Sequence, residues 1–307
     1  MKKKAIITGG TGFLGKAIIE KLIKANYLLF VLIRKESNLS FINHLLPCCK
    51  CIYYETLQDK ELLVLLEDAM NTDLFIHCAW KGVSNIERDQ ISQITYNITL
   101  TIDAVILANN LKCKKWVGMG SQAEYGIVND IAYEETTPIS PFSTYGKSKV
   151  ACYWAASGLC QIFGLPMLWC RIFSLYGIND NPNTLISYLI QSCLNSTSPS
   201  LTNCEQKWDY LYVVDGAEAI INLSESNEKG VFNIGSGKSV ALREVVNYIK
   251  KQINPHLYVG YGQKSYAENQ IMHLEADISK LKKVTNWKPV FDLQTGLSET
   301  INYYLKN

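Results

Sequence analysis

Residues 3–22 read KKAIITGGTGFLGKAIIEKL, and this stretch decides the fold. A short apolar run at 5–8 ends in a glycine-rich turn, which leads into a segment with helical spacing of its apolar residues. Gly9, Gly12 and Gly15 allow a tight turn whose backbone can approach a pyrophosphate, and the N-terminus of the following helix attracts that anion. The pattern predicts a dinucleotide-binding strand–turn–helix unit at the start of the sequence.

The same alternation of strand and helix continues through the first two-thirds of the chain. Because the expected strands are apolar almost throughout, they fit a parallel sheet that is covered by helices on both faces. The predicted fold class is α/β: a doubly wound Rossmann parallel sheet with a smaller α/β substrate-binding domain. The expected strands are 5–8, 28–33, 74–78, 116–120 and 167–173, and the expected helices are 15–25, 62–69, 94–109 and 145–163.

The pattern loosens after about Tyr176, where Asn, Pro and Ser clusters replace the regular alternation. No flexible linker, repeat or low-complexity tract separates two parts there, so the second domain is expected to form from segments that leave and rejoin the first. We expect the NAD(P)-binding Rossmann domain to comprise 1–176 and about 208–240. The substrate-binding domain is expected to comprise about 177–207 and 241–307.

Composition narrows the classes of function. Thirty basic and 28 acidic residues give a formal net charge of +2 without any charged block, so binding to nucleic acid or to a membrane surface has little electrostatic support. The apolar run that follows Lys2–Lys4 is too short for a signal peptide, and no later run approaches a membrane span. We therefore expect a cytoplasmic protein.

The ten cysteines are expected to be reduced thiols. One cluster, formed by His44, Cys48, Cys49 and Cys51, contains groups that zinc binds. However, adjacent cysteines rarely face one metal ion, and the pair of C-x-x-C units usual in zinc sites is absent. No metal site is expected.

The end of the second expected strand bears on the choice of cofactor. NAD-preferring proteins usually carry an acidic residue there, which binds the ribose 2′-hydroxyl, whereas this chain has Arg34 and Lys35. A guanidinium suits a 2′-phosphate, so NADP (NADPH) is the expected cofactor and NAD the alternative. The other interpretation of Arg34 is a solvated loop cation.

Three residues predict a catalytic centre. Tyr145 and Lys149 lie four apart at the start of an expected helix, so both project from one face. A phenol has an unperturbed pKa of about 10, and a nearby ammonium favours the phenolate form that acid–base work near neutral pH requires. Ser121 follows the strand 116–120, at the carboxyl edge where ligands meet a doubly wound sheet. Its hydroxyl would orient a substrate carbonyl beside the phenol.

These motifs resemble the extended short-chain dehydrogenase/reductase family (the NAD-dependent epimerases and dehydratases), and the resemblance covers essentially the whole chain in the expected order. Within the family, the chain is most similar to enzymes that modify nucleotide-activated sugars: epimerases, dehydratases and 4-keto reductases. The motifs that carry the resemblance are the glycine loop, GSQAEYG at 120–126, YGKSK at 145–149, RIFSLYG at 171–177, WDYLYVVDGAEA at 208–219, VFNIGSG at 231–237 and WKP at 287–289.

The resemblance implies a role for each matching residue. Tyr145 would be the acid–base group, Lys149 would hold the nicotinamide ribose, and Ser121 would bond to the reacting oxygen. Trp80 stands where relatives carry a small residue beside the cofactor, and it would form a wall of the sugar pocket. Asn97 matches a helix asparagine near that turn, as a site residue or as a structural hydrogen-bonding group. The implied cofactor contacts are Gly9, Thr11, Gly12, Phe13, Leu14, Gly15, Arg34, Lys35, Leu57, Ala79, Trp80, Tyr145, Lys149, Ile172 and Ser174.

The implied substrate contacts are Trp80, Gln122, Glu124 and Trp208. Gln122 and Glu124 would contact sugar hydroxyls, although Glu124 is equally interpreted as a loop carboxylate that faces solvent. Many relatives bind the substrate diphosphate with an arginine at the position of Trp208. Lys207, Lys264 or Arg243 would compensate for its loss, or Trp208 would stack on the base or the sugar.

The residues after Ser121 bear on the reaction. Dehydratases of this family typically carry an Asp-Glu pair there, and this chain has Gln122-Ala123, so elimination of water is not expected. An epimerase usually retains NAD, whereas Arg34 favours NADPH and net reduction. The expected function is therefore NADPH-dependent reduction of a nucleotide-linked 4-keto-6-deoxy sugar at C4, in the synthesis of surface polysaccharides.

Two alternatives stay open. One is a nucleotide-sugar 4-epimerase or a combined epimerase–reductase, which would need a further acid–base pair such as Cys and His near the sugar. The other, of a different class, is a catalytically silent NADP-binding regulator. By analogy with the family we also expect a homodimer, formed by the helices that contain Asn97 and Tyr145.

Overall fold

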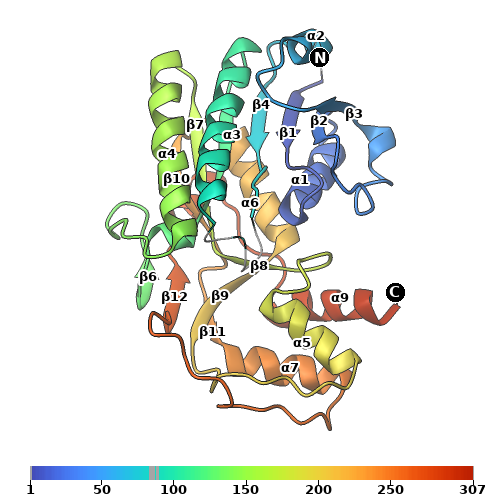
Figure 1. Cartoon of the computed structure of the whole chain (residues 1–307), viewed down its shortest axis with the longest axis vertical. Helices are drawn as coiled ribbons and strands as arrows, with labels where there is room; N and C mark the ends of the chain where they lie inside the picture. Colours follow the sequence, from blue (N-terminus) through green and yellow to red (C-terminus); the bar gives the residue numbers. More distant parts are fainter. Residues whose placement is uncertain (1, 83–86, 88–89, 307) are drawn as a thin grey trace.

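The computed structural model describes residues 2–82, 87 and 90–306, and within that part the strands form one large and one smaller sheet (Figure 1). The large sheet is parallel throughout and runs in the order β10-β7-β5-β4-β1-β2-β3. This order confirms the predicted doubly wound fold. Its strands are β1 (Lys4–Thr8), β2 (Leu28–Arg34), β3 (Lys50–Tyr54), β4 (Leu74–His77), β5 (Trp116–Ser121), β7 (Met167–Ile172) and β10 (Gly230–Ile234).

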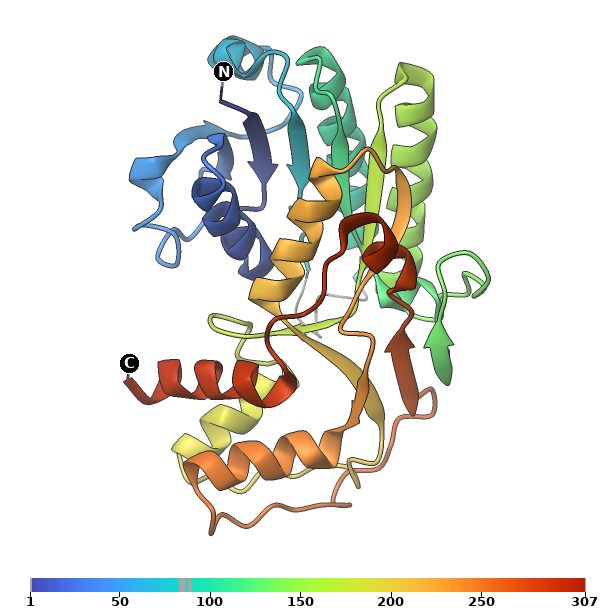
Figure 2. The same cartoon turned by 180° about the vertical axis from the view of Figure 1, so that it is seen from behind.

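Helices cover both faces of this sheet, as expected. Figure 1 shows α3 (Ile91–Asn110) and α4 (Thr144–Phe163) side by side on one face. Figure 2 shows the opposite face, which is covered by α1 (Phe13–Lys24), α6 (Val213–Glu225) and α8 (Ser279–Thr285). The short α2 (Lys60–Leu65) and the 3-10 turns η1 (Leu46–Cys48), η2 (Glu67–Ala69) and η3 (Gln122–Glu124) lie in the connections.

The apolar character of the strands follows from this two-sided cover. Ile6 and Ile7 are neighbours on β1, so their side chains point to opposite faces of the sheet. Ile7 joins the core beneath α1 and α6, whereas Ile6 joins the core beneath α3 and α4. Both residues are fully buried, and a strand with this environment is expected to be apolar at most of its positions.

α3 is long and apolar enough, by length and composition alone, to cross a membrane. It is the one helix of that kind among the described residues, and half of its most apolar stretch is buried inside the protein. The helix packs against α4 and against the sheet, which is the environment of a core helix.

The smaller sheet runs β11-β9-β12-β6, and β8 pairs with β9. Its strand β6, and β9 from Trp208 onward, lie in ranges that were expected to belong to the NAD(P)-binding domain. The helices α5, α7 and α9 pack around a third apolar core beside it (Figure 1). The bounds are β6 (Asp130–Ala132), β8 (Ser174–Tyr176), β9 (Lys207–Tyr212), β11 (Ser239–Ala241), β12 (His273–Ala276), α5 (Leu185–Leu194), α7 (Leu242–Ile253) and α9 (Leu293–Lys306).

Candidate functional site

The glycine loop connects β1 to α1 at the carboxyl edge of the large sheet, where the strand order reverses between β1 and β4. Gly9 has φ +70°, and a Cβ there would clash with the backbone of Cys78 and Ala79. The glycine loop therefore lies directly against the segment that follows β4. Gly12 is the N-cap of α1 and offers no side-chain hydrogen bond, so the first N–H groups of the helix are left for an anion.

The other predicted cofactor residues lie on elements that meet near this loop. Ile172 ends β7 and Ser174 begins β8, while Phe13 and Leu14 pack against the core beneath α1. Leu57 is 4% exposed and belongs to the core beneath α3 and α4. Its contact with the cofactor stays a prediction.

Arg34 ends β2, as predicted, and is partly exposed. Its Nη1 donates to the hydroxyl of Tyr96, at 3.4 Å, and within the described part of the chain Arg34 forms no ion pair. Its charge is therefore not cancelled by a carboxylate. Lys35 differs, because its ammonium forms an ion pair with Glu55 at the surface.

Ser121 ends β5 and caps η3, since its Oγ accepts a hydrogen bond from the N–H of Ala123 at 3.2 Å. This bond leaves the hydroxyl hydrogen of Ser121 to be donated elsewhere. Gly146 lies next to Tyr145 in the sequence, and a Cβ there would clash with the carbonyl oxygen of Ala123. The first turn of α4 thus packs directly on η3, which brings Tyr145 to the segment that carries Ser121.

Lys149 is 5% exposed and lies one turn after Tyr145 on α4. Its Nζ donates to the carbonyl oxygen of Met119 on β5 at 2.7 Å and lies 5.8 Å from the centre of the Tyr145 ring. The same Nζ lies only 3.6 Å from the centre of the Trp80 ring. Trp80 also meets Tyr145 edge to face, with ring centres 5.6 Å apart and an interplanar angle of 80°.

His77 is buried behind this cluster, and Cys78 beside it is half-buried. Burial, with the Lys149 ammonium as a second cause, lowers the pKa of His77 to about 3. Its Nδ1 shares a 2.8 Å hydrogen bond with the hydroxyl of Thr8. Burial raises the pKa of Cys78 to about 12, so the imidazole and the thiol are both neutral near pH 7. Cys113 precedes β5 and so lies at the end of that strand away from Ser121.

Glu124 is the main correction to the predicted site. It is fully buried, and its Oε2 accepts a hydrogen bond from Nε of Arg171 at 2.8 Å, in an ion pair that is almost inaccessible to solvent. Its Oε1 accepts from the backbone N–H of Ser121 at 2.8 Å and from the indole N–H of Trp169 at 3.0 Å. Both interpretations of the sequence, a sugar contact and a solvated loop carboxylate, are wrong, because these donors occupy the carboxylate.

Gln122 differs from Glu124. Its Oε1 is buried and has no hydrogen-bond partner among the described residues. An unpaired buried acceptor beside Ser121 fits the predicted substrate contact, since burial of such a group without a partner is costly.

A cavity of about 420 Å³ opens in the smaller lobe. Gln206 was not predicted as a site residue; it is 7% exposed, and its Oε1 has no partner within the described chain. Trp208 does not line the cavity; its indole N–H donates to the carbonyl oxygen of Ile271 at 3.0 Å. The only sequence signal for Gln206 was its place two residues before Trp208. The cavity is lined by Asn183, Leu185, Tyr188, Ser200, Leu201, Thr202, Cys204, Gln206, Leu242 and Lys264.

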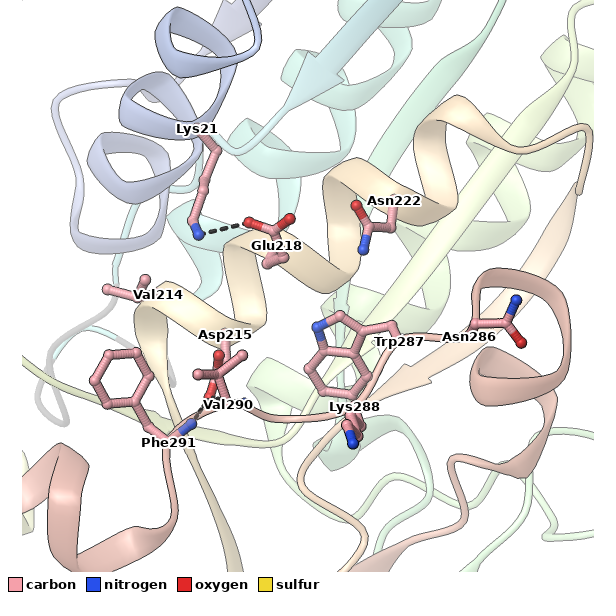
Figure 3. Close-up of a pocket in the computed structure, with 10 residues that line it drawn as sticks. All are labelled: Lys21, Val214, Asp215, Glu218, Asn222, Asn286, Trp287, Lys288, Val290 and Phe291. Carbon is pink, nitrogen blue, oxygen red and sulfur yellow. Dashed lines mark hydrogen bonds and ion pairs between the residues drawn. The ribbon is translucent and has the colours of Figure 1, made fainter.

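A second cavity, of about 430 Å³, lies between α1, α6 and the segment 286–291 (Figure 3). Lys21 and Glu218 form an ion pair across it, and the carboxylate of Asp215 accepts from the N–H groups of Val290 and Phe291. These contacts tie the C-terminal segment to α6. The cavity contains none of the predicted site residues, so we do not assign it to the reaction.

No group of three or more His, Cys, Asp or Glu side chains within the described ranges could hold a metal ion. The ten cysteines are free thiols, none of them in a disulfide within the described residues.

Comparison with known proteins agrees with this geometry. A provisionally named UDP-glucose 4-epimerase of Methanocaldococcus jannaschii is 28% identical over 98% of each chain. The dTDP-4-dehydro-6-deoxyglucose reductase of Escherichia coli is 24% identical over 98% of this chain and 97% of its own. The solved UDP-N-acetylglucosamine 4-epimerase of Methanobrevibacter ruminantium, in complex with UDP-N-acetylmuramic acid, is 26% identical, with a TM-score of 0.89 over 100% and 99% of the two chains.

The model of the NAD dependent epimerase/dehydratase family matches residues 5–235, which include the glycine loop, Ser121, Tyr145 and Lys149. The chain therefore belongs to the NAD dependent epimerase/dehydratase family, and it is an enzyme of the extended short-chain dehydrogenase/reductase type.

Proposed function

We propose that this enzyme is an NADPH-dependent reductase that acts at C4 of a nucleotide-linked 4-keto-6-deoxy sugar. The observation that carries the proposal is the convergence of Tyr145, Lys149 and Ser121 at the carboxyl edge of the sheet, beside the glycine loop. NADPH, when bound, supplies the hydride. Tyr145 donates the proton to the oxygen at C4, and the hydroxyl of Ser121 donates a hydrogen bond to that oxygen as negative charge develops on it.

Arg34 supports the choice of NADPH. Its guanidinium ends β2, at the position where an NAD-specific protein would place a carboxylate, and its hydrogen-bond partner is a neutral phenol. A 2′-phosphate would therefore meet a cation whose charge no carboxylate compensates. The fork of N–H groups on the guanidinium suits the oxygens of a phosphate. NAD remains the alternative cofactor.

The cavity of about 420 Å³ supports a nucleotide-linked substrate. Lys264 supplies a cation for a phosphate, and the unpaired Oε1 of Gln206 supplies an acceptor for an N–H group of a base. This arrangement compensates for Trp208, which stands where many relatives carry an arginine. The relatives named above act on, or hold, UDP-linked and dTDP-linked sugars.

A 4-epimerase is the second candidate, because two of the compared proteins carry that name. The uncompensated Arg34 favours reduction over epimerisation. His77 and Cys78 are both neutral near pH 7, which counts against their service as the further acid–base pair that a combined epimerase–reductase would need. The dTDP-4-dehydro-6-deoxyglucose reductase supports the same reaction class by its name.

The test is NADPH consumption with a panel of nucleotide-linked 4-keto-6-deoxy sugars, with Tyr145→Phe as the matched control. Rapid oxidation with one sugar, absent in the variant, supports the reductase and excludes a silent regulator. If NADPH binds but no sugar oxidises it, while UDP-sugars exchange configuration at C4 without net redox change, the enzyme is an epimerase.

We further propose a cytoplasmic homodimer that pairs the outer faces of α3 and α4. Trp154 and Ile162 lie two turns apart on α4 and are 64% and 77% exposed, an apolar surface that a second copy would cover. Light scattering after size exclusion should give twice the chain mass, and Trp154→Asp should give the monomer. A monomeric wild-type protein would contradict this assembly.

A further inference from the structure

The ring of Trp80 is the feature on which this inference rests. The resemblance to the family places a small residue there, yet this chain has an indole whose centre lies 3.6 Å from Nζ of Lys149. An ammonium above the face of an indole is attracted by the ring quadrupole, and the attraction grows when water is excluded. Lys149 is 5% exposed, so most of its solvent is replaced by protein.

The backbone that carries Trp80 is held on both sides. Before it, Ala79 and Cys78 touch the glycine loop closely enough that Gly9 can have no Cβ. After it, the side-chain amide of Asn97 clamps Lys81: the N–H of Lys81 donates to Oδ1, and Nδ2 donates to the carbonyl of Lys81, both at 2.9 Å. Asn97 is 1% exposed, so the clamp is a structural bond that fixes the path of the chain beside Trp80.

Lys149 is in turn held from two directions. Its ammonium donates to the carbonyl of Met119 on β5 and rests on the face of Trp80. The edge-to-face contact of Trp80 with Tyr145 connects the same indole to the phenol. One side chain therefore contacts both members of the Tyr–Lys pair.

We propose that Trp80 is a positioning residue that seats the ammonium of Lys149 and braces the ring of Tyr145. It does so through its aromatic face and edge, in addition to any role as a wall of the sugar pocket. The expected effect of Trp80 on turnover rests on the proposed function. Its expected effect on the position of the Lys149 ammonium does not.

The first test is therefore independent of any substrate. The protein is treated with limiting acetic anhydride, and acetylation of Lys149 is measured by peptide mass spectrometry against Lys147, an exposed lysine two residues away. Trp80→Leu should raise the Lys149/Lys147 labelling ratio at least about tenfold, as expected when a contact of about 1.4 kcal/mol is lost. Trp80→Phe keeps an aromatic face and should label like the wild type.

The second test is steady-state kinetics with the best sugar substrate. Trp80→Leu should lower kcat by about 30-fold and change KM for the sugar by less than about threefold. Trp80→Phe should restore kcat to within about threefold of wild type. Melting curves of each variant separate this effect from loss of the fold, and Trp80→Met replaces Trp80→Leu if the latter does not fold.

An unchanged labelling ratio in a folded Trp80→Leu protein would overturn the proposal, as would Phe and Leu variants that are equally slow. A loss confined to KM would show instead that Trp80 is only a wall. If wild type reduces no sugar but the labelling result holds, the proposed reaction fails while the positioning role stands.

Discussion

Removal of the negative charge of Glu124 should destabilise the protein strongly, even in a variant that keeps the size and shape of the side chain. In Glu124→Gln the amide oxygen can still accept from the N–H groups of Ser121 and Trp169, so the loss falls on the partner, Arg171. The side chains of Glu124 and Arg171 are 0% and 4% exposed. A guanidinium left buried without its counter-ion costs about 3–5 kcal/mol of unfolding free energy.

The assay is thermal and denaturant unfolding of single and double variants. Glu124→Gln should lower Tm by roughly 6–10 °C, taking about 2 °C per kcal/mol for a chain of this size. Arg171→Met should cost a similar amount, because it leaves the carboxylate buried. The double variant Glu124→Gln/Arg171→Met removes both charges, so it should cost less than the sum of the single variants by about 3 kcal/mol or more.

The surface pair Lys35–Glu55 provides the matched control. Both side chains are largely exposed, so Glu55→Gln should leave Tm unchanged within error. The reasoning is refuted if Glu124→Gln costs less than about 1 kcal/mol, or if the costs of the two single variants simply add. Below its Tm, Glu124→Gln should keep its turnover, because the amide oxygen still accepts from the backbone N–H of Ser121.

Three further predictions follow from other parts of the molecule. Arg34→Ala should raise the Kd for NADPH about 10–100-fold and leave that for NADH nearly unchanged, while Lys35→Ala should do less; fluorescence titration checks this, and equal losses for both cofactors would count against it. Lys264→Ala should raise KM for the nucleotide sugar about tenfold at constant kcat, in steady-state kinetics; a change in kcat alone would contradict a phosphate contact. Burial raises the pKa of Asp180 to about 6, above its ordinary value of 3.8, so its contribution to stability is complete below pH 3.8 and is lost as the pH rises through 6. Unfolding of Asp180→Asn compared with wild type at pH 4 and pH 7 should reveal a relative loss of about 2 kcal/mol in wild type, and parallel curves would refute it.

The sequence by itself predicted the fold and the catalytic trio. Strands buried on both faces are apolar almost throughout, so β1, β2, β4, β5 and β7 were visible as nearly continuous apolar runs. β3 was missed because it lies at the edge of the sheet, where only its last residue, Tyr54, is buried. The glycine loop and the spacing of Tyr145 and Lys149 are local features, since a turn and one helix face place those residues without help from distant parts of the chain.

Only the tertiary structure decided the surroundings of Glu124, Trp80 and Gln206. Glu124 follows a serine in a short polar turn, and nothing local distinguishes a solvated carboxylate from one that meets Arg171, which lies 47 residues further along the chain. Trp80 reaches Lys149 because β4 and α4 approach in space, and Gln206 faces a cavity that α5, α7 and the segment around Lys264 close together. The physical reason is common to all three: burial and charge pairing depend on which segments meet, and that is a property of the packed chain rather than of any short stretch of it.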